Sequence, residues 1–232
     1  MEPPELFVDS RLTGLCIYCG GPPDSRDHCP AKVLLDEPFP ADLPVVEACT
    51  SCNQSFSADE QYLACLIECV LCGSVDPAAH SRRKIRRMLG QNPKLAARIK
   101  QSERRGQDGS MYWEAQPERV RNVIVKLARG HLAYEFGLPL RGEPKFVSFM
   151  PFSAMSEDQI SEFEVPENNS KILWPEIGSR AFVRARIVAR GLVPNGWIVV
   201  QPRRYRYYVG QSNGDFVHLA LSEYLACRVI WS

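Results

Sequence analysis

The chain has 232 residues, of which 45% are hydrophobic, and this size suits one large or two small globular domains with a buried core. The formal net charge is only +1, but it is unevenly distributed: residues 1–79 carry 3 Lys and Arg against 13 Asp and Glu, whereas residues 80–130 carry 14 against 4. A basic middle segment is typical of chains that bind a polyanion, so we expect nucleic acid as a partner, although many basic helices are only solvated.

The N-terminal residues and the lengths of the apolar runs predict neither a signal peptide nor a membrane span. The opening MEPPELFVDS is acidic and has no apolar stretch of the kind found in signal peptides. No window reaches 18 uninterrupted apolar residues, so no membrane span is expected. We therefore expect a cytoplasmic protein, in which CxxC motifs are metal ligands or redox groups and not structural disulfides.

The predicted elements follow in chain order. Residues 16–48 are short apolar runs broken by GGPPDS and DEPFPADLP, which predicts strands and loops. A helix is expected over SFSADEQYLACLIECVLCG, with Ser57 as its N-cap and Gly73 at its end. Residues 80–105 predict two short basic helices divided near Gly90 and Pro93, and RGQDGS is expected to form a loop.

The second half changes character. A helix is expected to start at Pro117 and to end at Gly137. After Pro139 the apolar runs are β-branched and aromatic and are separated by PNG and SNGD, so we predict a largely antiparallel β unit. Within it, residues 156–170 are expected to form an exposed acidic loop.

Four of the nine cysteines have metal-ligand spacing. Cys16 and Cys19 form one CxxC pair, and Cys49 and Cys52 form a second. Two such knuckles supply four thiolates, the tetrahedral shell of a structural Zn²⁺ with no open position for catalysis. Cys65, Cys69 and Cys72 recur at helical spacing and are interpreted as a core stripe, with a second metal or redox site as the alternative. Cys29 and Cys227 are interpreted as packing residues, as are His131 and His218.

A second group of residues lies between and beside the knuckles. Asp27 and His28 stand between the two CxxC pairs, and Asn53 directly follows the last cysteine. Carboxylate and amide oxygens suit Mg²⁺ or Mn²⁺, which we expect Asp27 and Asn53 to hold, and a neighbouring imidazole can take a proton from water. These are the parts needed to hydrolyse a phosphodiester. The alternative for Asp27 and His28 is a carboxylate-oriented histidine of the core.

The order CxxC, DHCPAK and CxxCN resembles that of the HNH endonucleases with a ββα-metal core framed by zinc. The resemblance covers about residues 14–70. It implies that His28 is the general base and that Asp27 and Asn53 are the catalytic metal ligands. It also implies a structural zinc at Cys16, Cys19, Cys49 and Cys52.

We therefore expect an α+β chain in three regions: a treble-clef-like HNH core over 1–79, a basic helical region over 80–138 and a β-rich unit over 139–232. Basic residues in the last two regions are candidate nucleic-acid contacts, namely Arg82, Arg83, Lys84, Arg86, Arg87, Arg203, Arg204 and Arg206. For the tail, a cationic outer face over an aromatic inner face is an equal alternative.

The leading hypothesis is a metal-dependent HNH endonuclease that cuts DNA, with RNA not excluded. By analogy with small enzymes of this family it would be a bacterial anti-phage defence effector, switched on by a co-encoded partner such as an ATPase. One alternative is a non-catalytic zinc-ribbon adaptor that binds nucleic acid or protein. Another is a redox protein that cycles its CxxC cysteines.

Overall fold

The structure is a computed structural model that describes residues 14–165, 196–211 and 214–231. Internal contacts divide the chain into two compact units. Unit 1 combines the described residues up to Gln54 with those from Ile124 onward, and unit 2 is Ser55–Val123. Each unit is described by itself below.

Unit 1 begins with a small β-hairpin that follows the first CxxC pair. Strand β1 (Ser25–His28) pairs antiparallel with β2 (Val45–Ala48), so that Asp27 lies opposite Val46. The intervening segment contains one 3-10 turn, η1 (Lys32–Leu34). Strand β2 leads through Cys49 into the short helix α1 (Thr50–Ser55), which carries Cys52 and Asn53. Strands and loops were expected over 16–48, and the structure has them.

The rest of unit 1 is built on a five-stranded antiparallel sheet with the order β5-β9-β8-β7-β6. Its strands are β5 (Phe146–Pro151), β6 (Ile198–Gln201), β7 (Tyr205–Gln211), β8 (Asp215–Leu221) and β9 (Leu225–Ile230). This confirms the antiparallel β unit predicted for the C-terminal region. The run FVRARIVAR, also predicted as a strand, lies outside the described residues.

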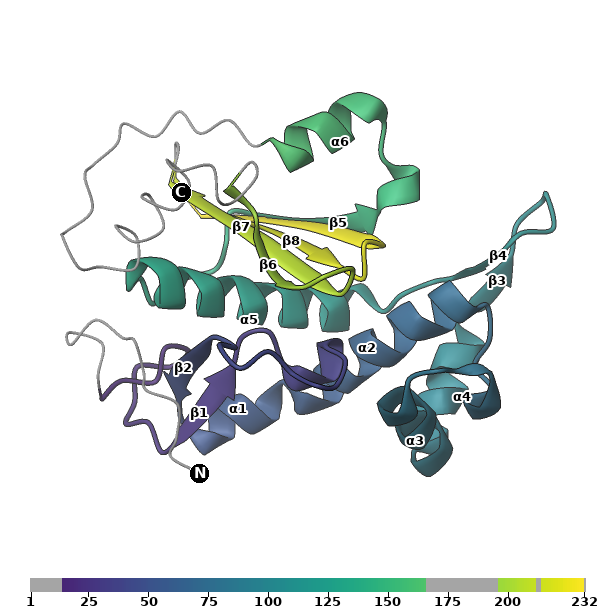
Figure 1. The fold of residues 1–232 in the computed structure, drawn as a ribbon, viewed down its shortest axis with the longest axis horizontal. Coiled ribbons are helices and arrows are strands. Elements are labelled where there is room, and N and C mark those ends of the chain that lie inside the picture. The colour runs from purple at the N-terminus through teal and green to yellow at the C-terminus, as the bar shows by residue number, and fades with distance from the viewer. Residues whose placement is uncertain (1–13, 166–195, 212–213, 232) are drawn as a thin grey trace. The chain divides into compact units, whose positions relative to one another are not determined.

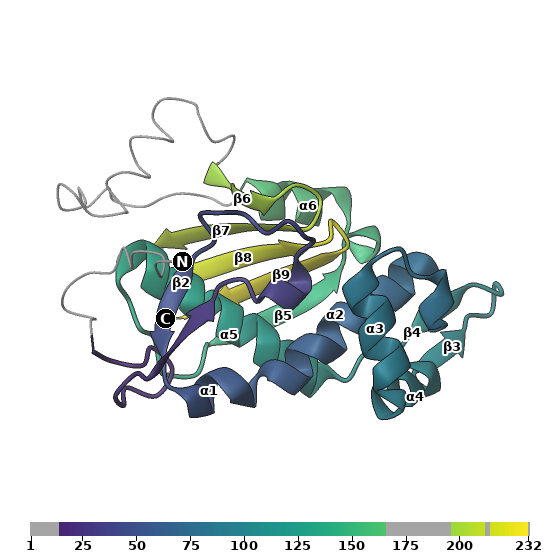
Figure 2. The same ribbon diagram turned by 60° about the horizontal axis from the view of Figure 1, so that its bottom comes forward.

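Two helices lie on opposite faces of this sheet (Figures 1 and 2). Helix α5 (Pro117–Phe136) starts at the predicted proline, and its part from Ile124 onward covers one face. The other face packs Tyr208 and Phe216 against Phe163 of α6 (Glu157–Glu164). Because side chains alternate along a strand, Tyr207 points to α5 while Tyr208 points to α6.

The prediction of an acidic loop over 156–170 was wrong for its described part, which contains α6. Ser156 caps this helix by accepting a hydrogen bond from the Gln159 backbone N–H, and the Gln159 side chain accepts one from Ser156 N–H. This reciprocal pair is a capping box, and the acidic residues of the first turn favour the positive end of the helix dipole. Phe163 then anchors the helix, because its side chain is completely buried.

Unit 2 is mainly helical. It contains α2 (Ser57–Cys72), the turn η2 (Pro77–Ala79), α3 (Arg83–Gln91), α4 (Pro93–Gln101), the hairpin strands β3 (Glu103–Arg105) and β4 (Met111–Trp113), and the first residues of α5. The two basic helices divided near Gly90 and Pro93 are confirmed. Gly73 ends α2 in the left-handed conformation, as expected. Phe56, and not Ser57, occupies the N-cap of α2.

Helices α3 and α4 of unit 2 are anchored by apolar side chains. Ile85 and Leu89 of α3 and Leu95 and Ile99 of α4 are all buried. On α2, Cys65 and Cys69 are fully buried, which agrees with a core stripe, whereas Cys72 is exposed. Across the described part of the chain, no helix is both long and apolar enough to cross a bilayer.

Candidate metal centre and catalytic hairpin

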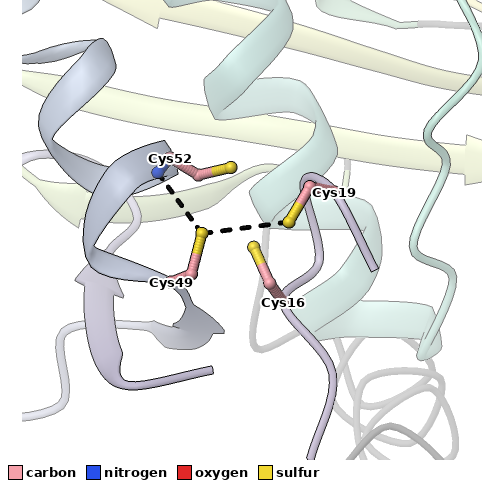
Figure 3. Close-up of side chains that lie close together, drawn as sticks. All are labelled: Cys16, Cys19, Cys49 and Cys52. Carbon is pink, nitrogen blue, oxygen red and sulfur yellow. Dashed lines mark hydrogen bonds between the residues drawn. The ribbon is translucent and has the colours of Figure 1, made fainter. Parts of the chain in front are cut away.

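The four cysteines of the CxxC pairs converge on one point of unit 1 (Figure 3). The Sγ atoms of Cys16, Cys19, Cys49 and Cys52 all lie within 4.8 Å of one another, and those of Cys19 and Cys49 are 3.8 Å apart. A tetrahedral Zn²⁺ with bonds of about 2.3 Å separates its sulfur ligands by about 3.8 Å. The group therefore fits a structural metal ion such as zinc.

Local backbone geometry builds each knuckle. The Gly20 N–H donates to the Cys16 carbonyl at 2.8 Å, and Gly20 has φ of +80°, a conformation that side chains other than glycine's rarely adopt. The Gly21 N–H points at the Cys19 Sγ, at 3.4 Å. In the second knuckle the Cys52 N–H points at the Cys49 Sγ, also at 3.4 Å.

The cysteine electrostatics also favour a bound cation. Burial alone would raise the pKa of Cys16, but backbone N–H groups of Cys49, Cys19 and Tyr18 outweigh it and lower the pKa to about 7. The pKa of Cys52 is raised well above its usual range by burial and by the neighbouring sulfurs of Cys49, Cys19 and Cys16. The protein alone therefore does not stabilise four thiolates together, whereas a dication at their centre would.

The predicted catalytic residues belong to the hairpin beside this cluster. Asp27 and His28 are consecutive on β1, and Asn53 lies on α1 immediately after the last cysteine. The Asn53 Nδ2 donates to the Arg26 carbonyl at 3.2 Å and to the Ser25 Oγ at 3.4 Å. The fold thus links Asn53 directly to the strand that carries Asp27 and His28.

The environment of Asp27 was not predicted. The residue is 5% exposed, and its Oδ2 lies 2.7 Å from the Lys126 Nζ and accepts a hydrogen bond from the Tyr18 hydroxyl, also at 2.7 Å. The Lys126 side chain is fully buried. A lysine inside the apolar run VIVKLA was the available signal, but nothing near it in sequence identified a partner 99 positions away.

This arrangement bears on the expected Mg²⁺ or Mn²⁺ ion. A lysine ammonium already neutralises the Asp27 carboxylate, and a second cation at the same oxygen would be repelled. Among the described residues the four cysteines are the one group of three or more His, Cys, Asp and Glu with metal-binding geometry. A Mg²⁺ or Mn²⁺ ion at Asp27 and Asn53 stays a prediction.

His28 lies at the end of β1 and is partly buried. Its pKa is lowered from 6.5, first by burial and then by the positive charges of Lys32 and Lys126, while Asp27 opposes the shift. The imidazole is therefore neutral at neutral pH, which is the form that can accept a proton.

The candidate nucleic-acid contacts of the central region differ in their partners. Arg83, Arg86 and Arg87 are exposed on α3. Arg82 is buried against Glu68 at 3.1 Å, and Lys84 is partly buried. Asp59, in the first turn of α2, is paired with Arg119 and accepts a hydrogen bond from the Asn122 Nδ2 at 2.7 Å.

In the C-terminal region most of the candidate contacts are held within unit 1. Arg204 pairs with Asp36, and Arg206 bonds both Glu164 and Glu223 while its guanidinium lies 4.3 Å from the Trp197 ring centre. Arg203 is exposed. Tyr205, Tyr207 and Tyr208 are all buried, so they pack in the core and do not face solvent.

The two histidines interpreted as packing residues are buried. The His131 Nε2 lies 2.8 Å from the Tyr205 hydroxyl, and its ring stacks on Tyr207 at 3.6 Å. The His218 Nδ1 lies 3.1 Å from the Phe163 carbonyl oxygen.

Comparison of the chain with protein-family profiles, with curated proteins and with solved structures finds no match.

Proposed function

We propose that the chain is an endonuclease of the HNH type that hydrolyses phosphodiester bonds in DNA, with His28 as general base. One observation carries the proposal: Asp27 and His28 lie together on β1, and Asn53 of α1 is hydrogen-bonded to that strand within a four-cysteine frame. A neutral, partly buried His28 supports the role of base. The four cysteines would hold a structural zinc that fixes the hairpin.

In this proposal His28 and Asp27 have distinct tasks. His28 takes the proton of an attacking water, and its ring is positioned by the strand that also carries Asp27. Asp27, bonded to Lys126 and Tyr18, anchors that strand in the interior. Cleavage would also require a divalent cation, as in the family it resembles, and this requirement is part of what must be tested.

A second candidate is a zinc-containing binding module without catalytic activity. The observation that favours it is the buried Asp27–Lys126 pair, because a carboxylate neutralised in this way serves the core. The basic residues of unit 2 would then serve binding alone. Both candidates predict zinc, and only the first predicts cutting.

The test is cleavage of supercoiled plasmid, linear duplex and single-stranded DNA, each with Mg²⁺ or Mn²⁺ and with neither. Native protein, His28→Ala and the exposed-site control Lys145→Ala are compared. Zinc content and melting temperature are first measured on all three, to establish that each is folded and carries the same amount of zinc. The proposal predicts metal-dependent cutting by the native and control proteins, with a loss of about 100-fold or more in His28→Ala.

Two other outcomes discriminate between the candidates. Cutting that persists in His28→Ala would reject His28 as the base. If no protein cuts, the assay is repeated with an ATPase encoded beside the chain, and continued inactivity with retained DNA binding supports the binding module.

A further inference from the structure

Helix α3 of unit 2 has one strongly cationic face. Arg83, Arg86 and Arg87 are spaced three and four residues apart, so they lie on the same side of the helix, opposite the buried Ile85 and Leu89. All three are exposed, and within the described part of the chain none of them forms an ion pair. Arg87 has only a neutral partner, the Gln91 Oε1 at 3.2 Å.

The charge around this face is one-sided. Residues 82–105 contain ten Lys and Arg and a single acidic residue, Glu103. That glutamate is paired with Lys100 at 2.7 Å, so it does not offset the charge of α3. Repulsion among these arginines is a cost to the folded chain that an anionic ligand would relieve.

The β3–β4 hairpin of the same unit adds a different kind of surface. Its turn is fixed by Asp108, whose Oδ1 accepts from the Ser110 N–H at 3.0 Å and from the Ser110 Oγ at 2.6 Å. Figure 1 shows the hairpin projecting beyond α3 and α4, and Figure 2 agrees. On it, Met111 is 43% and Tyr112 51% exposed.

The cations beside these exposed side chains complete the hairpin surface. The strand register places Arg104 opposite Tyr112 and Arg105 opposite Met111, so each large side chain has an arginine next to it. Arg104 pairs with Glu114 at 3.0 Å, whereas Arg105 forms no ion pair with any described residue. An exposed aromatic ring on a projecting hairpin is suited to stack on a base, while the exposed Arg105 of the same hairpin can contact phosphate.

We infer that unit 2 binds single-stranded DNA, with Arg83, Arg86 and Arg87 contacting phosphates and Tyr112 stacking on an unpaired base. The inference extends the proposed function by naming the form of DNA and the residues that hold it. Phosphate contacts release counterions and make binding depend on salt, whereas stacking is nearly independent of salt. The two contributions can therefore be measured separately.

The experiment is fluorescence anisotropy of the full chain with a labelled 20-nucleotide single strand and with a blunt duplex of the same sequence. No Mg²⁺ or Mn²⁺ is added, so binding is read without cleavage, and the salt concentration is varied. The variants are the triple change R83Q/R86Q/R87Q and the single changes Tyr112→Ala and Tyr112→Phe. A matched triple, K32Q/R141Q/K145Q, removes the same charge from exposed positions of unit 1.

For the α3 triple variant we expect about tenfold weaker binding and a log–log salt slope smaller by roughly 2, since each single-strand contact contributes about 0.7. Tyr112→Ala should weaken single-strand binding about tenfold without changing the slope, and should leave duplex binding unchanged, while Tyr112→Phe binds like the native chain.

The inference is overturned if the two triple variants weaken binding equally, because the attraction would then be general and not located on α3. It is also overturned if Tyr112→Ala leaves single-strand binding unchanged or weakens binding to both DNA forms alike. Binding as predicted from a chain that never cuts would reject the proposed nuclease and leave this inference standing.

Discussion

Helix α3 of unit 2 and the later part of helix α5 in unit 1 use charged residues in opposite ways. On α3 the charges point outward and the buried positions are Ile85 and Leu89. On α5 the buried positions include Lys126, His131 and Glu135, each with a partner in the rest of unit 1: Asp27, Tyr205 and Tyr207, respectively.

The difference concerns what fixes the register in which each helix packs. An apolar helix face can pack in several registers, whereas leaving the charge of a buried Lys126 or Glu135 unpaired would cost several kcal/mol. In unit 1 these pairs fix the hairpin and the sheet against α5. The substitutions below should therefore be severe in unit 1 and mild at comparable positions of unit 2.

The largest effect is expected for Cys49→Ser, which removes one ligand of the four-cysteine group. Zinc content should fall from about one equivalent to near zero, and the free energy of unfolding should fall by about 4 kcal/mol or more. For a chain of this length that lowers the melting temperature by about 8–16 °C. The exposed Cys72 of unit 2 supplies the control, since Cys72→Ser should retain zinc. Equal zinc in both variants would refute the four-cysteine site.

Lys126→Met should lower the free energy of unfolding by about 3–5 kcal/mol, because it leaves the Asp27 carboxylate buried without its cation. The double variant K126M/D27N should recover more than half of that loss in urea unfolding. The comparison in unit 2 is Lys100→Met. The Lys100 side chain is 64% exposed, so this change should lower the free energy of unfolding by less than about 1 kcal/mol. A double variant no more stable than Lys126→Met would show that the pair is not coupled.

Acid should weaken unit 1 through His218. Burial lowers the pKa of His218 from 6.5 to about 4, although the Phe163 carbonyl opposes the shift. Between these values the unfolded chain binds a proton that the folded chain does not, so stability is full above about pH 6.5 and falls as the pH drops toward 4.

The size of this effect follows from about 1.4 kcal/mol per pKa unit, which gives a loss of about 2 kcal/mol between pH 7 and pH 5. Urea unfolding of native protein and His218→Gln at both pH values isolates the contribution. The variant should lose about 2 kcal/mol less than the native chain, and parallel losses would contradict the assignment.

The smallest effects are expected for two glycine-to-alanine changes, which should alter the free energy of unfolding in opposite directions in the two units. An alanine Cβ at Gly130 of α5 would lie 2.5 Å from the Cys29 Sγ, whereas at Gly90 of α3 it would meet nothing within 4 Å. Gly130→Ala should destabilise by about 1–3 kcal/mol, and Gly90→Ala should stabilise by up to about 1 kcal/mol.

The clash at Gly130 can be relieved directly. The double variant G130A/C29A removes the opposing sulfur and should be more stable than Gly130→Ala alone, as melting temperatures would record. If Gly130→Ala is itself stabilising, β1 does not approach α5 as closely as the structure has it.

Features with local causes were predictable from the sequence. Two CxxC pairs predict a four-sulfur site because each knuckle is a single turn. The break between α3 and α4 is also local, because Asn92 caps α4 and Pro93 starts it. The capping box of α6 was also local, but the acidic residues around it were interpreted as a loop.

Features that depend on distant partners were not predictable. Lys126 meets Asp27 across 99 positions, and Arg206 meets Glu164 and Glu223 across 42 and 17. Nothing in RYRYY distinguishes arginines held by glutamates from arginines open to DNA, because the pairing is made by the sheet and by α6. The hypothesis of Asp27 as a metal ligand likewise did not anticipate that a lysine would reach it.

The central claim is that the two CxxC knuckles, one before β1 and one at the start of α1, hold one metal ion between them. Zinc K-edge X-ray absorption of the purified chain, with metal content measured on the same sample, tests it most directly. The account predicts one zinc per chain with four sulfur ligands at about 2.3 Å. Oxygen or nitrogen in the first coordination shell, or a folded chain that binds no metal, would contradict it.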